Sequence, residues 1–182
     1  MRTTRQEALW ALRAQCGSRE ALELLLASVQ APLRSYLLSL VGPADADDVV
    51  QEVLILVYRK LRWLEAPDAF RPWVFRIASR AAFRHLRKTK RWREHVDDDD
   101  VLEELPAHET PPPPPELLQR LAATNGISPA SRAVLLLHFQ EELSLPEVAA
   151  VLAIPLGTVK SRLAYGLAAL RKQLGGSRSS PV

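Results

Sequence analysis

The stretch LSLPEVAAVLAIPLGTVKSRLAYGLAALRKQL, residues 143–174, predicts two helices joined by a tight turn. The first helix opens on Ser144, with Pro146 in its first turn and Glu147 completing the pattern of a capping box. After the turn at 153–155, apolar residues recur every three or four positions, which predicts one buried helical stripe. Its members are Leu156, Val159, Leu163, Leu167, Leu170 and Leu174.

The face opposite this stripe is polar and cationic. With its flanks it carries Thr158, Lys160, Ser161, Arg162, Tyr165, Arg171 and Lys172. Short hydroxyl side chains and cations suit a helix laid in the major groove of DNA, where early residues meet base edges and Lys or Arg meets phosphate. We therefore expect a DNA-reading helix-turn-helix. An ordinary amphipathic hairpin within an all-α domain is the alternative.

The N-terminal part of the chain also has helical periodicity. It runs through residues 4–40, with breaks expected near Gly17 and at Pro32 and an end at Gly42. These helices are interpreted as scaffold.

A long helix is then expected from Asp45, with Asp47 and Asp48 in its first turn, where carboxylates complement the helix dipole. Capping is the interpretation we favour for Asp45 and Asp47. Glu52 lies beyond the first turn, so the dipole does not account for it.

Pro67 ends that helix, residues 65–71 form a loop, and a further helix is expected over 72–91. Five of its arginines share one face: Arg76, Arg80, Arg84, Arg87 and Arg91. Like charges at this spacing repel by about 0.2–0.5 kcal/mol per pair, so an unneutralised stripe favours a polyanion as partner, with a solvated face as the alternative. Aromatic residues lie among these cations and can stack unpaired bases or fill a core. They are Phe70, Trp73, Phe75, Phe83 and Trp92. For Trp73 and Phe75, a place in the core is at least as good an interpretation.

Charge is very unevenly distributed. Residues 71–93 hold nine basic and no acidic residues, whereas 94–116 hold nine acidic and no basic ones. The acidic stretch, with five consecutive prolines at 111–115, has too little apolar surface to order itself. Helices are expected again over 116–124 and 128–140. The predicted fold class is therefore all-α, with two small helical domains at 1–93 and 116–175, a flexible acidic, proline-rich linker at 94–115 and a disordered tail at 176–182.

Other functions have little support in the sequence. Cys16 is the only cysteine, the four histidines have no metal-like spacing, and no glycine-rich phosphate loop occurs. We expect no enzyme, no cofactor, no metal and no small-molecule substrate. The N-terminus has charges at Arg2, Arg5, Glu7 and Arg13 and no apolar h-region, so we expect no export. Because no run of about 18 apolar residues occurs, we also expect no membrane insertion.

Two pairs of motifs resemble one family. Residues 45–53 (DADDVVQEV) and 70–78 (FRPWVFRIA) resemble region 2 of bacterial sigma factors. Residues 143–149 (LSLPEVA) and 155–163 (PLGTVKSRL) look like region 4 of the same family. With no region 1 or region 3 domain, the chain is similar to the small extracytoplasmic-function (ECF) group.

The resemblance implies a cytoplasmic specificity subunit that docks on bacterial RNA polymerase core and recognises promoter DNA. Asp48, Gln51 and Glu52 would contact the clamp helices of the largest catalytic subunit, and the β flap is a further implied contact. The minus-10 element would be bound by Phe70, Arg71, Trp73, Arg76, Arg80, Arg84 and Arg87. The minus-35 element would be read by Thr158, Lys160, Ser161, Arg162 and Tyr165. The linker would thread through polymerase, and the alternative is that it is only a solvated spacer. An anti-sigma factor is a further implied partner.

The chain also departs from the family pattern. Family members often have asparagine where Arg80 stands and aspartate where Arg84 stands, and more cations after Leu163. We therefore expect an altered minus-10 contact and weaker minus-35 binding, since each lost phosphate contact lowers the slope of log K against log salt by about 0.9. A stand-alone helix-turn-helix regulator, using residues 116–174 alone, is the competing hypothesis.

Overall fold

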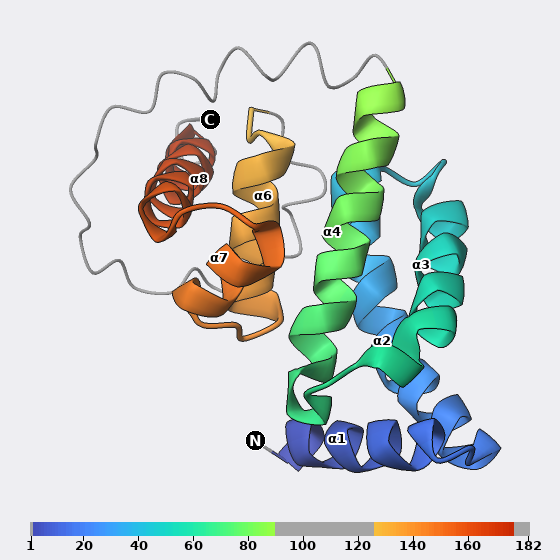
Figure 1. The fold of residues 1–182 in the computed structure, drawn as a ribbon. Helices are drawn as coiled ribbons and strands as arrows, with labels where there is room; N and C mark the ends of the chain where they lie inside the picture. The colour runs from blue at the N-terminus through green and yellow to red at the C-terminus, as the bar shows by residue number, and fades with distance from the viewer. Residues whose placement is uncertain (1, 90–125, 177–182) are drawn as a thin grey trace, which may run out of the picture. The chain divides into compact units, whose positions relative to one another are not determined.

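The computed structural model describes residues 2–89 and 126–176. Within those ranges the regular structure is entirely helical, and the chain divides into two compact units, residues 1–86 and 87–182 (Figure 1). This confirms the predicted all-α class. The expected linker and the helix over 116–124 lie outside the described residues, as do Arg91 and Trp92.

The first unit is built from four helices within its described part. These are α1 (Arg2–Gln15), α2 (Arg19–Val41), α3 (Ala46–Lys60) and α4 (Phe70–Lys88), with the 3-10 turns η1 (Leu61–Trp63) and η2 (Pro67–Ala69) between α3 and α4. Figure 1 shows α2, α3 and α4 side by side, with α1 lying across the end at which α4 begins. The predicted loop at 65–71 is thus partly helical, and α4 begins two residues earlier than expected.

The core of this unit centres on Tyr36 of α2. Its ring meets that of Phe75 edge to face, with centroids 5.3 Å apart, and both side chains are fully buried. Ser79 donates a hydrogen bond to the Phe75 carbonyl at 2.7 Å, and the Tyr36 hydroxyl lies 2.7 Å from the Ser79 oxygen. Because Ser79 has one proton to give, Tyr36 is the donor in the second bond. The core interpretation of Phe75 is therefore correct.

The break expected at Pro32 does not occur, because α2 continues through it to Val41. A proline inside a helix costs about 3 kcal/mol. Leu25 and Val29 before it, and Leu33 and Leu37 after it, are fully buried. Burying each such side chain contributes about 1.5–3 kcal/mol, so packing on one face outweighs the penalty. The other expected limits hold, since Ser18 caps α2 and Gly42, at φ 90°, ends it.

By length and composition α2 could also cross a membrane. A core helix meets the same test, and α2 buries one whole face inside the unit. We therefore interpret it as the central core helix.

The second unit contains α6 (Pro129–Leu135), the π-helical turn η5 (Leu136–Gln140), α7 (Leu145–Leu152) and α8 (Leu156–Gly176) in its described part. Ser128 caps α6, its side chain accepting a hydrogen bond from the Ser131 amide at 3.1 Å. The helix predicted over 128–140 therefore exists, with a wider last turn.

Helices α7 and α8 form the predicted helix-turn-helix. Both hydrogen bonds of the capping box are present: the Ser144 amide donates to the Glu147 carboxylate at 2.8 Å, and the Glu147 amide donates to the Ser144 hydroxyl. Ala153 ends α7 in the left-handed conformation, at φ 56°. The two helices meet at 105°, within the range of about 90–120° typical of this motif.

The buried stripe of α8 is confirmed at Val159, Leu167 and Leu170, which are at most 4% exposed. The prediction was wrong for Leu156, which is 40% exposed. As the first residue of α8, Leu156 directs its Cβ back toward the preceding turn rather than over the core.

Candidate nucleic-acid interface

One face of α3 is exposed and carries the three residues expected to bind polymerase. Asp48, Gln51 and Glu52 all reach solvent. Farther along the same face, Ile55 is 50% and Tyr58 60% exposed. Ile55 and Tyr58 were not predicted from the sequence, although their helical spacing from Asp48 and Gln51 could have indicated one continuous exposed edge of α3.

The capping interpretation is corrected for Asp45, whereas Asp47 lies in the first turn of α3 as expected and is in addition paired within the unit. Asp45 occupies the N-cap position of α3 but makes no side-chain capping bond, and its carboxylate lies 3.2 Å from the His85 ring. Asp47 accepts a hydrogen bond from Arg34 at 2.8 Å, and this carboxylate raises the pKa of the Arg34 guanidinium.

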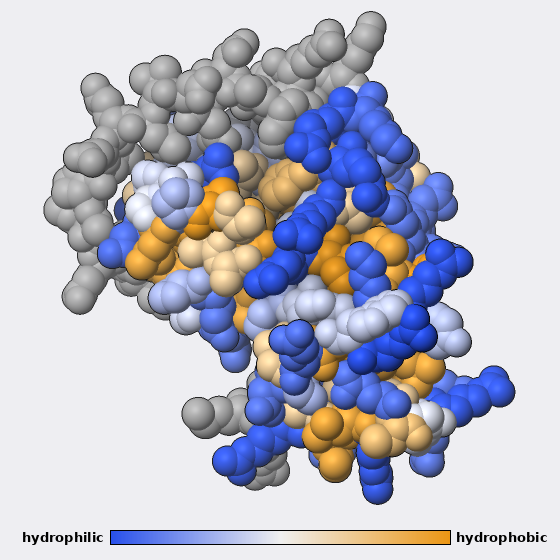
Figure 2. All heavy atoms as spheres, viewed as in Figure 1, coloured by the Kyte–Doolittle hydropathy of each residue, from blue (hydrophilic) through white to orange (hydrophobic). Residues whose placement is uncertain are grey.

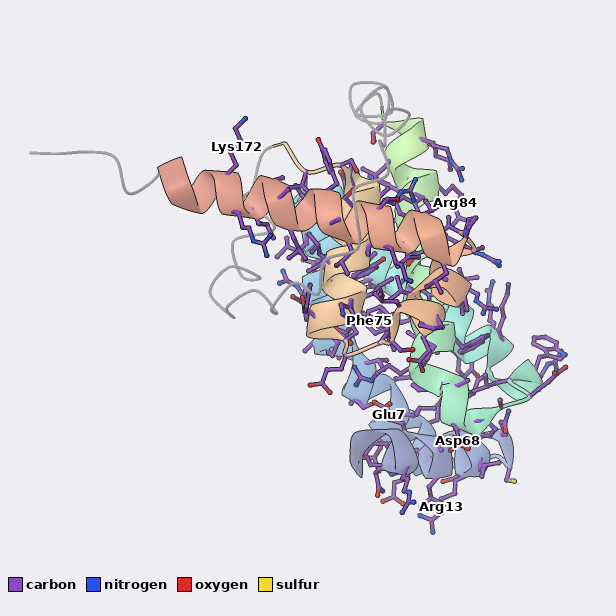
Figure 3. The ribbon with its side chains drawn as sticks, turned by 90° about the vertical axis from the view of Figure 1, so that its left-hand side faces the viewer. Glu7, Arg13, Asp68, Phe75, Arg84 and Lys172 are labelled. Carbon is purple, nitrogen blue, oxygen red and sulfur yellow. The ribbon has the colours of Figure 1, made fainter. Side chains whose placement is uncertain are left out.

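The arginine face of α4 is partly neutralised by a carboxylate of α3. Arg84 forms an ion pair with Glu52 of α3, both about half exposed, so α3 and α4 are linked across the surface. Arg80 and Arg87 are exposed, while Arg76 is half-buried. Figure 2 shows hydrophilic side chains gathered over the C-terminal part of α4, and Figure 3 places Arg84 toward that end of the helix. In its described part the stripe therefore presents two exposed cations, Arg80 and Arg87, beside the Arg84–Glu52 pair.

A hollow of about 260 Å³ lies where η1 and the loop meet α4. It is lined by Trp63, Leu64, Glu65, Ala66, Ala69, Pro72, Trp73 and Arg76. Its volume is below the range of about 300–1,000 Å³ found for drug-sized ligands, so it suits a single small ring system. Trp63 is 61% exposed, with the Arg62 guanidinium 3.8 Å from its ring centroid. Trp63 was missed in the sequence, where it has no aromatic neighbour.

Two residues of the expected minus-10 set point inward. Phe70 is 1% exposed and packs within the core, 6.2 Å from the Trp73 ring. Arg71 donates to the Glu7 carboxylate of α1 at 2.8 and 3.3 Å, and Glu7 is itself 1% exposed. Phe70 thus completes the core and Arg71 neutralises a buried carboxylate, while direct DNA binding by either residue stays a prediction.

In the second unit, Lys160 is the exposed member of the expected minus-35 set. Thr158, Ser161, Arg162 and Tyr165 are half-buried, and the Ser161 hydroxyl donates to the Thr158 carbonyl at 3.1 Å. Lys172, farther along α8, projects away from the helix (Figure 3). The helix thus offers cations at both ends of the described part of its surface.

These two units define a class of protein. A basic helix beside an aromatic-lined hollow suits unstacked nucleic acid, and a capped helix-turn-helix with a cationic second helix suits duplex DNA. The combination is that of a two-module DNA-binding transcription factor.

Comparison with known proteins specifies the family. The family model for Sigma-70 region 2 matches residues 25–93, and that for Sigma-70, region 4 matches residues 125–172. The chain is 30% identical to the RNA polymerase sigma-H factor of Pseudomonas aeruginosa over 96% of both proteins. It is 32% identical to the ECF RNA polymerase sigma-E factor of Escherichia coli, over 83% of this chain and 85% of that one.

Solved structures agree. The chain is similar to CnrH in complex with the cytosolic domain of CnrY, at a TM-score of 0.68 and 26% identity, covering 94% of this chain and 98% of that one. It is also similar to the sigma factor RpoE in complex with the anti-sigma factor NepR from Bartonella quintana, at a TM-score of 0.63 and 26% identity, covering 86% and 98%.

The chain therefore belongs to the sigma-70 family of RNA polymerase sigma factors, in the ECF group. Members of this family are transcription initiation factors that bind RNA polymerase core in the bacterial cytoplasm and direct it to promoters. The match to region 2 as well as region 4 favours this function over a stand-alone helix-turn-helix regulator.

Proposed function

We propose that the exposed edge of α3 is the surface through which this sigma factor binds core polymerase. Asp48, Gln51 and Glu52 supply its polar part, and Ile55 and Tyr58 extend it with apolar surface. A helix edge that combines acids with exposed apolar residues suits docking against another helix or groove. The clamp helices of the largest catalytic subunit are the proposed partner.

The minus-10 element is proposed to bind along α4 and the hollow beside it. Arg80, Arg84 and Arg87, which are exposed on α4, would meet the phosphates of the DNA strand. Trp73 and Arg76, which line the hollow, would hold one unstacked base of the melted non-template strand. Phe70 and Arg71 support this surface from within.

The minus-35 element is proposed to be read by α8, with Lys160 reaching DNA phosphate and Ser161 and Arg162 nearer base edges. Thr158 and Tyr165 complete the reading surface. Because few cations follow Leu163, we expect the second module to bind DNA weakly without polymerase. Contact of this module with the β flap of core polymerase would compensate for the weak DNA binding by holding the module at the promoter.

The domain limits at 1–93, 94–115, 116–175 and 176–182 are proposed as well, with the acidic linker joining modules that bind separate promoter elements. An anti-sigma factor is a further proposed partner, since CnrH and RpoE are each seen with another protein. It would compete with core for the α3 edge. The chain itself would catalyse no reaction and act in the cytoplasm, leaving the chemistry to polymerase.

The observation that carries the proposal is the exposed acidic edge of α3 in a chain that matches both sigma regions. Its test is transcription by purified core and the full chain on genomic fragments of the source bacterium, with transcript starts mapped. Glu52→Lys should abolish the starts that depend on the added chain. Glu23→Lys, the same charge change at an exposed position of α2, should leave them intact.

A different outcome would favour the competing hypothesis. A chain that gives no new starts with core, yet binds duplex DNA specifically by itself in both wild-type and Glu52→Lys forms, would be a stand-alone regulator.

A further inference from the structure

Helix α1 lies outside the residues matched by the region 2 family model, yet it holds both ends of the segment that lines the hollow. Near its C-terminus, the Gln15 side-chain amide donates to the carbonyls of Leu61 and Leu64, at 2.9 and 2.8 Å. Nearer its N-terminus, Glu7 binds Arg71. These contacts bracket residues 61–71, the segment that runs from η1 through η2 to the start of α4.

The Gln15 contact fixes the backbone of the η1 turn, whereas the Glu7 contact fixes the side chain of Arg71. The Leu61 carbonyl already accepts a hydrogen bond from the Leu64 amide within η1, and Gln15 uses its two N–H groups to bind this carbonyl and that of Leu64, so one side chain ties both ends of the turn to α1. Glu7 accepts from two nitrogens of Arg71, and this fork geometry fixes the orientation of the guanidinium as well as its position. Residues 7 and 15 lie about 12 Å apart along a helix at 1.5 Å per residue, so α1 sets a rigid span.

A buried carboxylate is an expensive way to hold a helix in place, because an apolar pair of similar volume is often as stable. Glu7 is 1% and Arg71 19% exposed, and Ser28 lies 3.2 Å from the same carboxylate. The η2 turn also contacts α1 directly, and Figure 3 shows Glu7 and the η2 residue Asp68 at the α1 end of the unit. Unlike apolar packing, the ion pair also fixes the direction in which the Arg71 side chain points.

We infer that Glu7 and Gln15 are positioning residues for the minus-10 site: α1 holds residues 61–71 in the one arrangement in which Trp63, Trp73 and Arg76 line the hollow. This inference rests on the proposed function of that hollow. Neither residue touches DNA. They act by fixing the spacing between η1 and the start of α4, and so the shape of the hollow that receives a base.

The first test is amide hydrogen exchange in the full chain, which needs no promoter. Gln15→Leu and Glu7→Gln should speed exchange in residues 61–71 several-fold and leave residues 126–176 unchanged. Gln6→Leu is the matched control, because it makes the same substitution as Gln15→Leu at an exposed position of the same helix. Unchanged exchange at 61–71 in both variants would overturn the bracing role whether or not the chain is active in transcription.

The second test is base preference. With core polymerase and a promoter library randomised across the minus-10 element, both variants should relax the preference at one or two adjacent positions, while affinity for core and the minus-35 preference stay as in wild type. A general loss of stability would instead lower all three together and contradict the inference, as would an unchanged minus-10 preference. Should Glu7→Gln not fold, Gln15→Leu carries the test, and a wild-type chain that supports no initiation would refute the proposed function instead.

Discussion

At the scale of single residues, the buried ion pair between Glu7 and Arg71 joins α1 to the start of α4. Removing one partner from such a pair leaves the other charge buried and unpaired, at a cost of about 3–5 kcal/mol, whereas replacing both with apolar residues is often neutral. The identity of the two residues therefore matters less for stability than their being matched.

We predict that Glu7→Leu lowers the free energy of unfolding of the first unit by about 3–5 kcal/mol, and that Glu7→Leu combined with Arg71→Met restores most of it. Urea unfolding followed by tryptophan fluorescence reports mainly on this unit, because Trp10, Trp63 and Trp73 lie within residues 1–86 and the described part of the second unit contains no tryptophan. If the double variant is as unstable as the single one, the unpaired Arg71 charge is not the cause of the lost free energy of unfolding, and the prediction is wrong.

This pair also marks the limit of inference from sequence at the residue scale. The motif around Arg71 was visible, and its cation suggested DNA. Its partner, however, lies 64 positions earlier, and no local pattern connects the two. The Glu52 and Arg84 pair, 32 positions apart, was hidden in the same way, so the arginine stripe looked less neutralised than it is.

At the scale of the element, α4 is the helix on which DNA melting is proposed to depend. Arg76→Ala combined with Arg80→Ala should reduce open-complex formation, because it removes one cation lining the hollow and one exposed cation beside it. Permanganate reactivity of thymines around the minus-10 element measures this. Arg13→Ala combined with Arg19→Ala, at exposed positions on α1 and α2, should have no such effect. Unchanged reactivity in the α4 variant would place the melting surface elsewhere.

Helix α8 packs against α6 at Gly166, where an added Cβ would lie 2.7 Å from Leu135 Cδ1 and 3.2 Å from its Cγ. Leu135 is fully buried, so it has little room to move. Gly166→Ala gains about 0.8–1.0 kcal/mol of helix propensity, but overpacking costs about 1–3 kcal/mol.

We therefore predict that Gly166→Ala is neutral to destabilising by up to about 2 kcal/mol, and that Gly166→Val is more destabilising still. Gly157→Ala, on the same helix with open space around it, should instead be stabilising. Thermal unfolding of the second unit, followed by circular dichroism, compares the three. A stabilised Gly166→Ala variant would contradict the close approach of α8 to α6.

Helices were the part of the fold that periodicity and capping signals predicted best. The capping box at Ser144 and the end of α2 at Gly42 depend on residues next to each other in the chain, and both are present. The break predicted at Pro32 does not occur because tertiary packing of the flanking residues outweighs the local rule. The burial predicted for Leu156 was wrong because periodicity did not show that this residue is the first of its helix.

At the scale of the whole molecule, the chain combines two helical units whose sequences match two regions of one family. The sequence indicated this division from its shift in charge and from paired motifs in the right order. It could not indicate how α1 supports the hollow, because that depends on hydrogen bonds from Gln15 to backbone carbonyls nearly fifty positions away.

We expect this chain to direct transcription initiation only when it is bound to core polymerase through α3. The most direct measurement is the affinity of the purified full chain for core polymerase, with Glu52→Lys and Glu23→Lys compared in the same titration. We predict tight binding by the wild-type chain and by Glu23→Lys, and a loss of at least about tenfold, or 1.4 kcal/mol, for Glu52→Lys. Equal affinity of all three proteins for core would contradict the α3 interface, and no binding by any of them would contradict the account as a whole.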